Sequence, residues 1–142
     1  MKKISVILCC FLFLNTFSSF AQKEKISPDF NNFKGVVLFI KPSFKIPTRI
    51  LESKLEKHYK GAYKILEEGD LKSGDYANVE TYPFLIEFIY DGTTNGASIF
   101  NFIMTDRIHK KSFKSNSIAD NTLPAYAGIS KYVKKLEDER SK

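Results

Sequence analysis

Beyond the N-terminal segment, the apolar positions of this chain begin with an unbroken run. Residues 36–40 read Val-Val-Leu-Phe-Ile, and Pro42 follows them closely. A short apolar run that is rich in β-branched side chains and bounded by proline is typical of a strand buried on both faces. We therefore predict a central strand of a sheet within residues 33–41.

The apolar positions then change to helical spacing. Charged residues alternate with an apolar face made of Ile50, Leu51, Leu55, His58 and Tyr59. This pattern predicts a helix with one face buried and one face in water. Pro47 and Thr48 suit its start, with Thr48 as the N-cap, and Gly61 suits its end. Residues 62–67 follow as a second predicted strand.

The strongest hairpin pattern comes after an acidic, glycine-containing loop over residues 68–78. Residues 83–90 and 99–105 are two apolar runs, and Asp91-Gly92 and Asn95-Gly96 provide turn signals between them. Residues 112–114 are more ambiguous, and we favour a further short strand there over a basic loop.

A second helix is predicted at the C-terminal end. Asn121 or Thr122 would cap it, with Pro124 in its first turn. Its apolar stripe consists of Tyr126, Ile129, Val133 and Leu136. Its polar face carries Lys131, Lys134 and Lys135, which are within reach of Asp138 and Glu139.

These elements predict an α+β fold. We expect a single mixed sheet of four to five strands, in the order β-α-β-β-β-(β)-α, packed by two helices, because each helix has one apolar stripe to bury. The predicted organisation is a signal peptide over residues 1–21, a polar N-terminal tether over 22–32 and one domain over 33–140.

The signal peptide is predicted from three features. Lys2 and Lys3 give a positive start, and residues 4–14 are almost entirely apolar. Ser19-Phe20-Ala21 then places small residues where a signal peptidase reads them, so we expect cleavage before Gln22. As a helix the apolar stretch is roughly 17 Å long, against about 30 Å of membrane hydrocarbon. We predict a secreted protein, periplasmic or extracellular, with no transmembrane segment after cleavage.

Composition narrows the possible chemistry. Loss of the leader removes Lys2 and Lys3, so 20 basic residues remain against 16 acidic ones, a net charge of +4. The same cleavage removes Cys9 and Cys10, the only cysteines, which excludes disulfides and thiol catalysis from the mature chain. Nucleic acid is not an expected partner, because the chain is exported and its basic residues are interleaved with acids.

The sequence contains no catalytic motif. It lacks a nucleophile elbow, a phosphate-binding glycine loop and a zinc-protease helix, so we assign no catalytic residue, no metal site and no cofactor. His58 is interpreted as a residue at the boundary of the core. Asp106-x-x-His109 offers two metal ligands, which we interpret as a solvated turn. Glu87 interrupts an apolar strand. We expect it either to face the wet side of the sheet or to pair with a lysine across the hairpin, and a place in the lining of a pocket is the less common alternative.

The densest basic segment is the best candidate binding surface. Its basic residues are Arg107, His109, Lys110, Lys111 and Lys114, and Phe113 lies among them. Basic residues around an aromatic ring suit an anionic glycan or a lipid headgroup. The alternative is a hairpin turn kept soluble by its lysines, because lysines on edge strands commonly prevent pairing with another chain. Tyr76 and Tyr82 flank the acidic loop, where they either cap the core or form a docking surface.

The sequence therefore predicts a non-enzymatic binding or accessory domain in the bacterial envelope or outside the cell. Its partner would be an envelope protein or an anionic glycan or lipid headgroup. One alternative is a small hydrolase or metal-dependent enzyme that uses His58 or His109 with a carboxylate. Another is an inhibitor or chaperone-like partner that adds a strand to the edge of a sheet.

Overall fold

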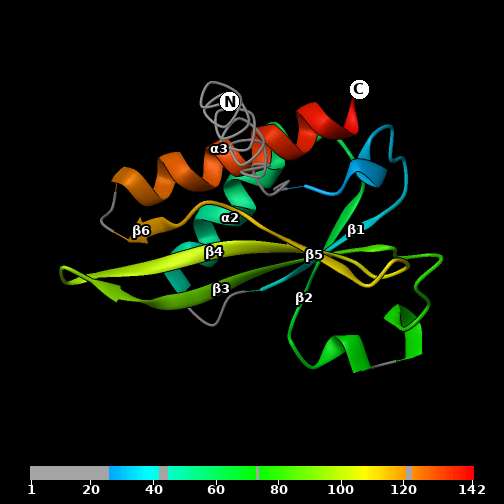
Figure 1. Cartoon of the computed structure of the whole chain (residues 1–142), viewed down its shortest axis with the longest axis horizontal. Helices are drawn as coiled ribbons and strands as arrows, with labels where there is room; N and C mark the ends of the chain where they lie inside the picture. The colour runs from blue at the N-terminus through cyan, green and yellow to red at the C-terminus, as the bar shows by residue number, and fades with distance from the viewer. Residues whose placement is uncertain (1–25, 42–44, 73, 121–122) are drawn as a thin grey trace, which may run out of the picture.

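A computed structural model describes residues 26–41, 45–72, 74–120 and 123–142 of the chain. The predicted signal peptide lies outside these residues. The α+β class is confirmed, with two long helices packed on a mixed sheet (Figure 1). The described sheet has six strands, one more than the upper end of the prediction. The strands are β1 (Val37–Ile40), β2 (Tyr63–Leu66), β3 (Phe84–Thr94), β4 (Ala97–Asp106), β5 (Lys111–Lys114) and β6 (Ile118–Asp120).

The order across the sheet is β2-β1-β3-β4-β5. β5 pairs with residues 103–106 of β4, and β6 pairs with residues 98–100 of the same strand. β1 is parallel to both of its neighbours, and every other pairing is antiparallel. All four residues of β1 are buried, which confirms the predicted strand covered on both faces. The sequence analysis missed β6, because three residues are too few to show an alternating pattern.

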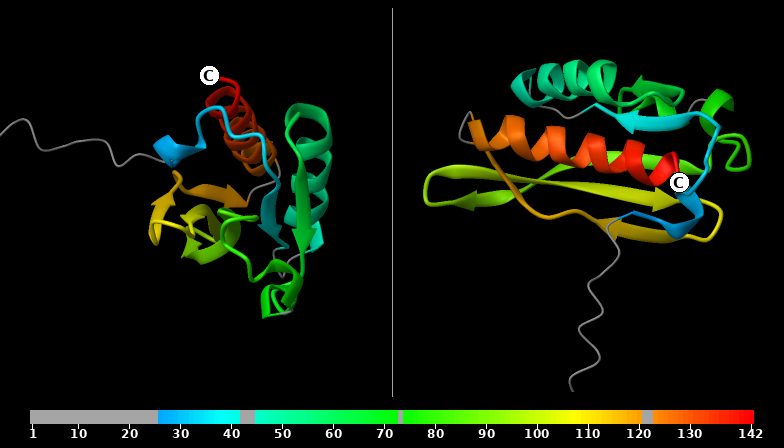
Figure 2. Two further views of the ribbon diagram at one scale, coloured as in Figure 1. Left: turned by 90° about the vertical axis from the view of Figure 1, so that its right-hand side faces the viewer. Right: turned by 90° about the horizontal axis from the view of Figure 1, so that it is seen from above.

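Both helices cover one face of the sheet (Figure 2). They are α2 (Lys45–His58) and α3 (Leu123–Arg140). The main core lies between these helices and the sheet, and its fully buried side chains include Phe39, Leu55, Phe102, Val133 and Leu136. Aromatic and branched side chains of this size each contribute roughly 1.5–3 kcal/mol when buried.

The predicted start of α2 and one residue of the predicted stripe of α3 are wrong. α2 begins at Lys45, so Thr48 lies inside the first turns and is not the N-cap. Pro47 is compatible with this position, because the first-turn amides of a helix have no partner within it. The predicted caps Asn121 and Thr122 of α3 lie outside the described residues. Within the predicted stripe of α3, Tyr126 is exposed, and Tyr132 is buried in its place.

The hairpin is longer than its apolar runs indicated. Asn95 and Gly96 form the turn with φ of 50° and 78°, the left-handed values that a two-residue type I′ turn requires. Asp91-Gly92 does not form part of the turn. It lies within β3, where the register shifts between Tyr90 and Gly92 and Gly92 has a φ of 118°. A bulge at this point explains why a turn signal occurs inside a strand.

The segment before β1 contributes to the core over its described part. Residues 26–32 belong to the predicted tether, but they contain a short 3₁₀-helix, η1 (Pro28–Phe30), that Ser27 caps. Ile26 is 7% exposed and Phe30 is fully buried. Phe30 packs edge-on against Phe84, with 5.1 Å between the ring centroids. Two apolar side chains therefore anchor this segment to the sheet.

A second, smaller core lies on the opposite face of the sheet. Leu38, Ile40, Leu66 and Leu85 form it. The loop that contains η2 (Asp70–Lys72) and η3 (Gly74–Tyr76) covers them, and Tyr76 and Tyr82 pack there with 5.5 Å between their rings. The two tyrosines therefore cap the core, one of the two roles considered for them. Among the described residues, no helix is both long and apolar enough to cross a membrane.

Candidate functional sites on the turn and on helix α3

The predicted basic segment spans the turn between β4 and β5 and continues into β5, which contains Lys111 and Phe113. Arg107 donates hydrogen bonds to the backbone oxygens of Tyr82 at 2.9 Å and Ala77 at 3.2 Å, so its guanidinium holds the loop before β3. Phe113 is half-buried against the main core. Lys110 and Lys111 are exposed. Two members of the predicted surface thus have packing roles.

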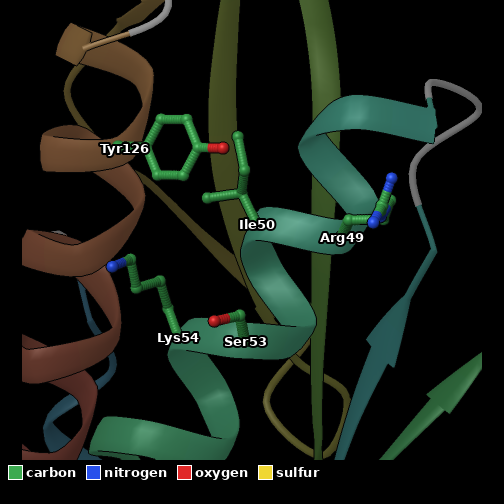
Figure 3. A pocket seen from close by; sticks show the side chains of 5 residues that line it. All are labelled: Arg49, Ile50, Ser53, Lys54 and Tyr126. Carbon is green, nitrogen blue, oxygen red and sulfur yellow. The ribbon is translucent and has the colours of Figure 1, made fainter.

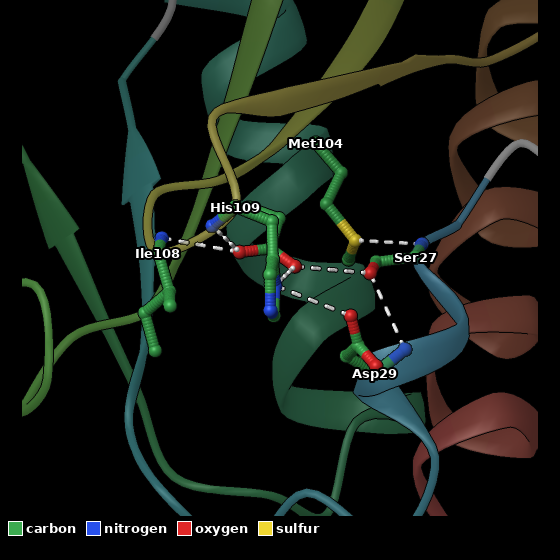
Figure 4. A network of polar contacts seen from close by, with 6 residues as sticks. Ser27, Asp29, Met104, Ile108 and His109 are labelled. Carbon is green, nitrogen blue, oxygen red and sulfur yellow. Dashed lines mark hydrogen bonds and ion pairs between the residues drawn. The ribbon is translucent and has the colours of Figure 1, made fainter.

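His109, which also belongs to the predicted basic segment, takes part in a network of polar contacts (Figure 4). Its Nδ1 lies 2.9 Å from Oδ2 of Asp106 and 3.3 Å from Oδ2 of Asp29. Oδ1 of Asp106 accepts hydrogen bonds from the backbone amides of Ile108 at 3.1 Å and His109 at 2.9 Å. The hydroxyl of Ser27 also donates to Oδ2 of Asp106, at 3.4 Å.

Asp106 is the buried centre of this network. Only 1% of the residue is exposed. Burial alone would raise its pKa, but the hydrogen bonds from the backbone and ring of His109 outweigh that effect, so the pKa lies below its usual value. The sequence analysis noted the spacing of Asp106 and His109 but interpreted it as a solvated turn, which is wrong for the buried Asp106. It missed Asp29, which lies 77 residues before Asp106 in the chain.

His58 has a different environment. It is half-buried at the end of α2. Partial burial and then the nearby charges of Lys134, Lys57 and Lys54 lower its pKa. Among the described residues, no acid makes an ion pair with it, and the charges nearest to it are lysines. The described chain therefore does not show the carboxylate partner that the enzyme alternative assigns to His58.

One hollow of about 290 Å³ separates α3 from the chain that links β5 to β6. It is lined by Ser115, Asn116, Ser117, Ile118, Gly128, Lys131, Tyr132 and Lys135. We call this hollow the α3 cleft. Its lining includes two cations, three hydroxyl-bearing side chains and an amide, but no carboxylate.

Tyr132 gives the α3 cleft a buried polar atom. The residue is 6% exposed, and its ring lies parallel to that of Phe102. Its hydroxyl has no hydrogen-bond partner among the described residues. Burial raises the pKa of this hydroxyl, so it stays protonated and available as a donor.

A second hollow, of about 470 Å³, lies between α2 and α3 (Figure 3). We call it the interhelix cleft, and it is lined by Arg49, Ile50, Ser53, Lys54 and Tyr126. Nζ of Lys54 lies 5.9 Å from the ring centroid of Tyr126, which is 47% exposed. The lining resembles that of the α3 cleft, with two cations, two hydroxyl-bearing side chains and no carboxylate.

Three lysines lie on the side of α3 that runs from the interhelix cleft to the α3 cleft. At 100° per residue, Lys134, Lys131 and Lys135 lie in that angular order from the α2 side to the α3 cleft. We expected them to pair with Asp138 and Glu139, but no such ion pair occurs among the described residues. The acids of the last turns are engaged elsewhere: Glu137 binds Arg140, and Glu139 binds Lys142.

Glu87 lies on the opposite face of the sheet. Its backbone neighbours are Ile40 on β1 and Ile103 on β4. Partial burial, and then the charge of Glu68, raise the pKa of this carboxyl. No lysine of the described chain pairs with it; Lys114 binds Asp91 instead, at 2.9 Å.

No family model matches this chain, and no curated protein matches it. Among solved structures, it is similar to a single-residue variant of the PelC dodecamer from Paraburkholderia phytofirmans, at 12% identity and a TM-score of 0.47, over 75% of this chain and 93% of that one. A second structure of the PelC dodecamer from the same organism matches at 12% identity and a TM-score of 0.42, over 75% and 90%. At this distance the likeness assigns no function.

Proposed function

We propose that this protein is an exported, non-enzymatic binding domain for an anionic glycan of the bacterial envelope or its surroundings. One observation carries the proposal: the two clefts that flank α3 are both lined by cations and hydroxyls and by no carboxylate. Export rests on the predicted signal peptide.

The lining of the α3 cleft suits an acidic sugar. Lys131 and Lys135 offer charged donors to a carboxylate or sulfate, and hydrogen bonds to charged groups are stronger than neutral ones. The side-chain amide of Asn116 offers polar groups to sugar hydroxyls. The hydroxyls of Ser115 and Ser117 donate to the backbone oxygen of Asn116 and to Oδ1 of Asn101, so their oxygens are left to accept from a sugar.

The interhelix cleft extends this surface. Tyr126 exposes part of its ring beside Lys54, so the cleft offers an apolar face next to a cation. A sugar ring can pack its C–H face on an exposed aromatic ring while its acid group contacts the lysine. Lys134 and Lys131 lie between the clefts, which suits a polymer that carries charges at intervals better than a single small anion.

Binding to defined polysaccharides tests the proposal. We expect the purified protein to bind alginate, a polymer of uronic acids, and not the neutral polymer dextran. The double variant Lys131→Gln/Lys135→Gln should lose affinity roughly tenfold or more. The matched control is Lys110→Gln/Lys111→Gln, which removes the same charge from the β4–β5 turn and should retain affinity.

Three results would contradict the proposal. They are equal binding of dextran, no binding of any acidic polysaccharide, or an effect confined to the Lys110/Lys111 variant. The last result would place the glycan-binding site on the β4–β5 turn, in the basic segment that the sequence predicted as a binding surface. Export has its own test, because mass spectrometry of the protein recovered from an envelope or culture fraction should find Gln22 as the first residue.

The two alternative functions remain predictions. A small hydrolase would use His109, whose ring contacts Asp106. A strand-adding partner would use β2, which lies at one end of the strand order and pairs with β1.

A further inference from the structure

We infer that Asp29, Asp106 and His109 form a binding site for one divalent transition-metal ion of the Zn²⁺ class. Their three ligand atoms all lie within 4.8 Å of one another. They come from two distant parts of the chain: Asp29 from η1, and the other two from the end of β4 and the turn that follows. This site is separate from the glycan site proposed above.

The distances fit a small tetrahedral ion. Zinc binds histidine nitrogen and carboxylate oxygen at about 2.0–2.2 Å, so two ligands of a tetrahedral site lie about 3.3 Å apart. Nδ1 of His109 lies 3.3 Å from Oδ2 of Asp29 and 2.9 Å from Oδ2 of Asp106. Small side-chain adjustments would therefore place all three atoms on one ion.

The ligand types select the class of metal. One imidazole nitrogen and two carboxylate oxygens suit Zn²⁺ and its first-row neighbours. Calcium takes six to eight oxygen ligands, and magnesium usually keeps several waters, so a site with one imidazole does not favour either. The two carboxylates balance the charge of a divalent ion.

Neighbouring groups hold one ligand in place and leave the site open. Asp106 is fixed by the amides of Ile108 and His109 and by the hydroxyl of Ser27, the kind of support that orients metal ligands. The side chains of His109 and Asp29 are 52% and 61% exposed, so an ion can enter from solvent and keep a water as a fourth ligand. His109 would bind through Nδ1 and carry its proton on Nε2.

The consequence is a link between the N-terminal segment and the sheet. Phe30 already anchors η1 through the core, and the metal would add a second attachment on the other side of the same turn. Binding to the folded state alone stabilises that state by mass action.

Titration of the untagged mature chain, which begins at Gln22 and has no cysteine, with ZnCl₂ after treatment with EDTA and dialysis tests this inference. We expect saturable binding of one equivalent by calorimetry and a rise of several degrees in the midpoint of thermal unfolding. MgCl₂ and CaCl₂ at the same concentrations should give neither effect. A bound Co²⁺ ion should show visible absorption bands.

The variants His109→Ala and Asp29→Asn should each lower zinc affinity at least about tenfold and abolish the cobalt bands. His58→Ala and Asp75→Asn, matched controls elsewhere on the surface, should leave both unchanged. Asp29 is exposed, so its variant tests the site even if His109→Ala unfolds the turn. Absence of saturable zinc binding would overturn the inference. So would binding that survives both site variants, or binding that His58→Ala removes.

Discussion

The rings of Phe102 on β4 and Tyr132 on α3 lie parallel, with 4.1 Å between their centroids and 2° between their planes. Stacked aromatic pairs contribute about 0.5–1.5 kcal/mol beyond the area that they bury. Because Phe102 is fully buried at the centre of the sheet, this pair joins α3 to the core.

Removal of the Tyr132 hydroxyl and removal of its whole ring should have different effects on stability. Tyr132→Phe keeps the stacked ring and removes a buried donor without a partner, so the free energy of unfolding should stay unchanged or rise by about 1 kcal/mol. Tyr132→Ala should lose about 3–5 kcal/mol. Urea unfolding measures both. A large loss of stability in the phenylalanine variant would show that the hydroxyl has a partner.

Gly128 is predicted to resist substitution because of its contact with β6. A Cβ atom there would lie 2.8 Å from Cγ2 of Ile118, a stiff β-branched side chain. Overpacking of this kind costs about 1–3 kcal/mol, which should exceed the gain of about 1 kcal/mol from replacing glycine by alanine in a helix. We expect Gly128→Ala to lower the free energy of unfolding.

The control for that substitution is Gly69→Ala, because nothing lies within 4 Å of a Cβ at Gly69. Its effect should stay within about 0.5 kcal/mol. The second variant Ile118→Ala removes Cγ1 and Cγ2, the two atoms closest to the added Cβ, and should therefore reduce the loss caused by Gly128→Ala if the clash is its cause. A stabilised Gly128→Ala protein would contradict the close approach of α3 and β6.

The pKa of His58 should report the charge of the helix surface. Partial burial and the cations around it hold this pKa below the ordinary value of about 6.5. Lys134→Gln removes the largest of the charge effects, so the pKa should rise. NMR titration of the ring protons measures it. Lys110→Gln should leave it unchanged, and an equal rise in both variants would rule out a local effect of Lys134.

Glu87→Gln should stabilise the protein at neutral pH but not in acid. The folded pKa of Glu87 is raised, so the folded state binds the proton more tightly, and stability falls as pH rises from the unfolded value of about 4.3 through the folded one. At pH 7 we expect a midpoint of thermal unfolding about 1–3 °C above that of the parent. At pH 3.5 the difference should vanish.

The exposed loop residue Glu80 provides the control for that prediction, since Glu80→Gln should have little effect at either pH. An equal gain at both pH values would mean that the Glu87 substitution acts through packing and not through its charge.

Local pattern predicted most of the fold, and its errors have physical causes. The run at residues 36–40 identified β1, because a strand covered on both faces needs apolar side chains on both. The spacing of Leu51 and Leu55 identified α2. The sequence did not predict β6, because this strand is only three residues long. Its pairing with β4 also depends on its contacts with α3, which no local pattern encodes. The prediction that Asp91-Gly92 lies in the turn is wrong, because a β-bulge and a turn favour the same residue types and the sequence does not distinguish them.

The candidate sites were harder to predict than the fold. Asp106 and His109 are visible as a pair at short spacing, but nothing in the sequence relates them to Asp29. Lys131 and Lys135 resemble an ordinary solvated helix face, and their acidic neighbours in sequence suggested ion pairs. The unpartnered hydroxyl of Tyr132 could not be seen, because hydrogen-bond satisfaction is a property of packed neighbours.

The sequence by itself determined the α+β class, the central buried strand, the hairpin and the two amphipathic helices. Each depends on periodicity along the chain, which local residue types encode directly. Only the tertiary structure decided that η1 brings Asp29 to His109 and that α3 forms a cation-lined cleft with the chain before β6. Contacts between residues far apart in sequence arise when several elements bury their apolar faces together, and no local pattern records which side chains then meet.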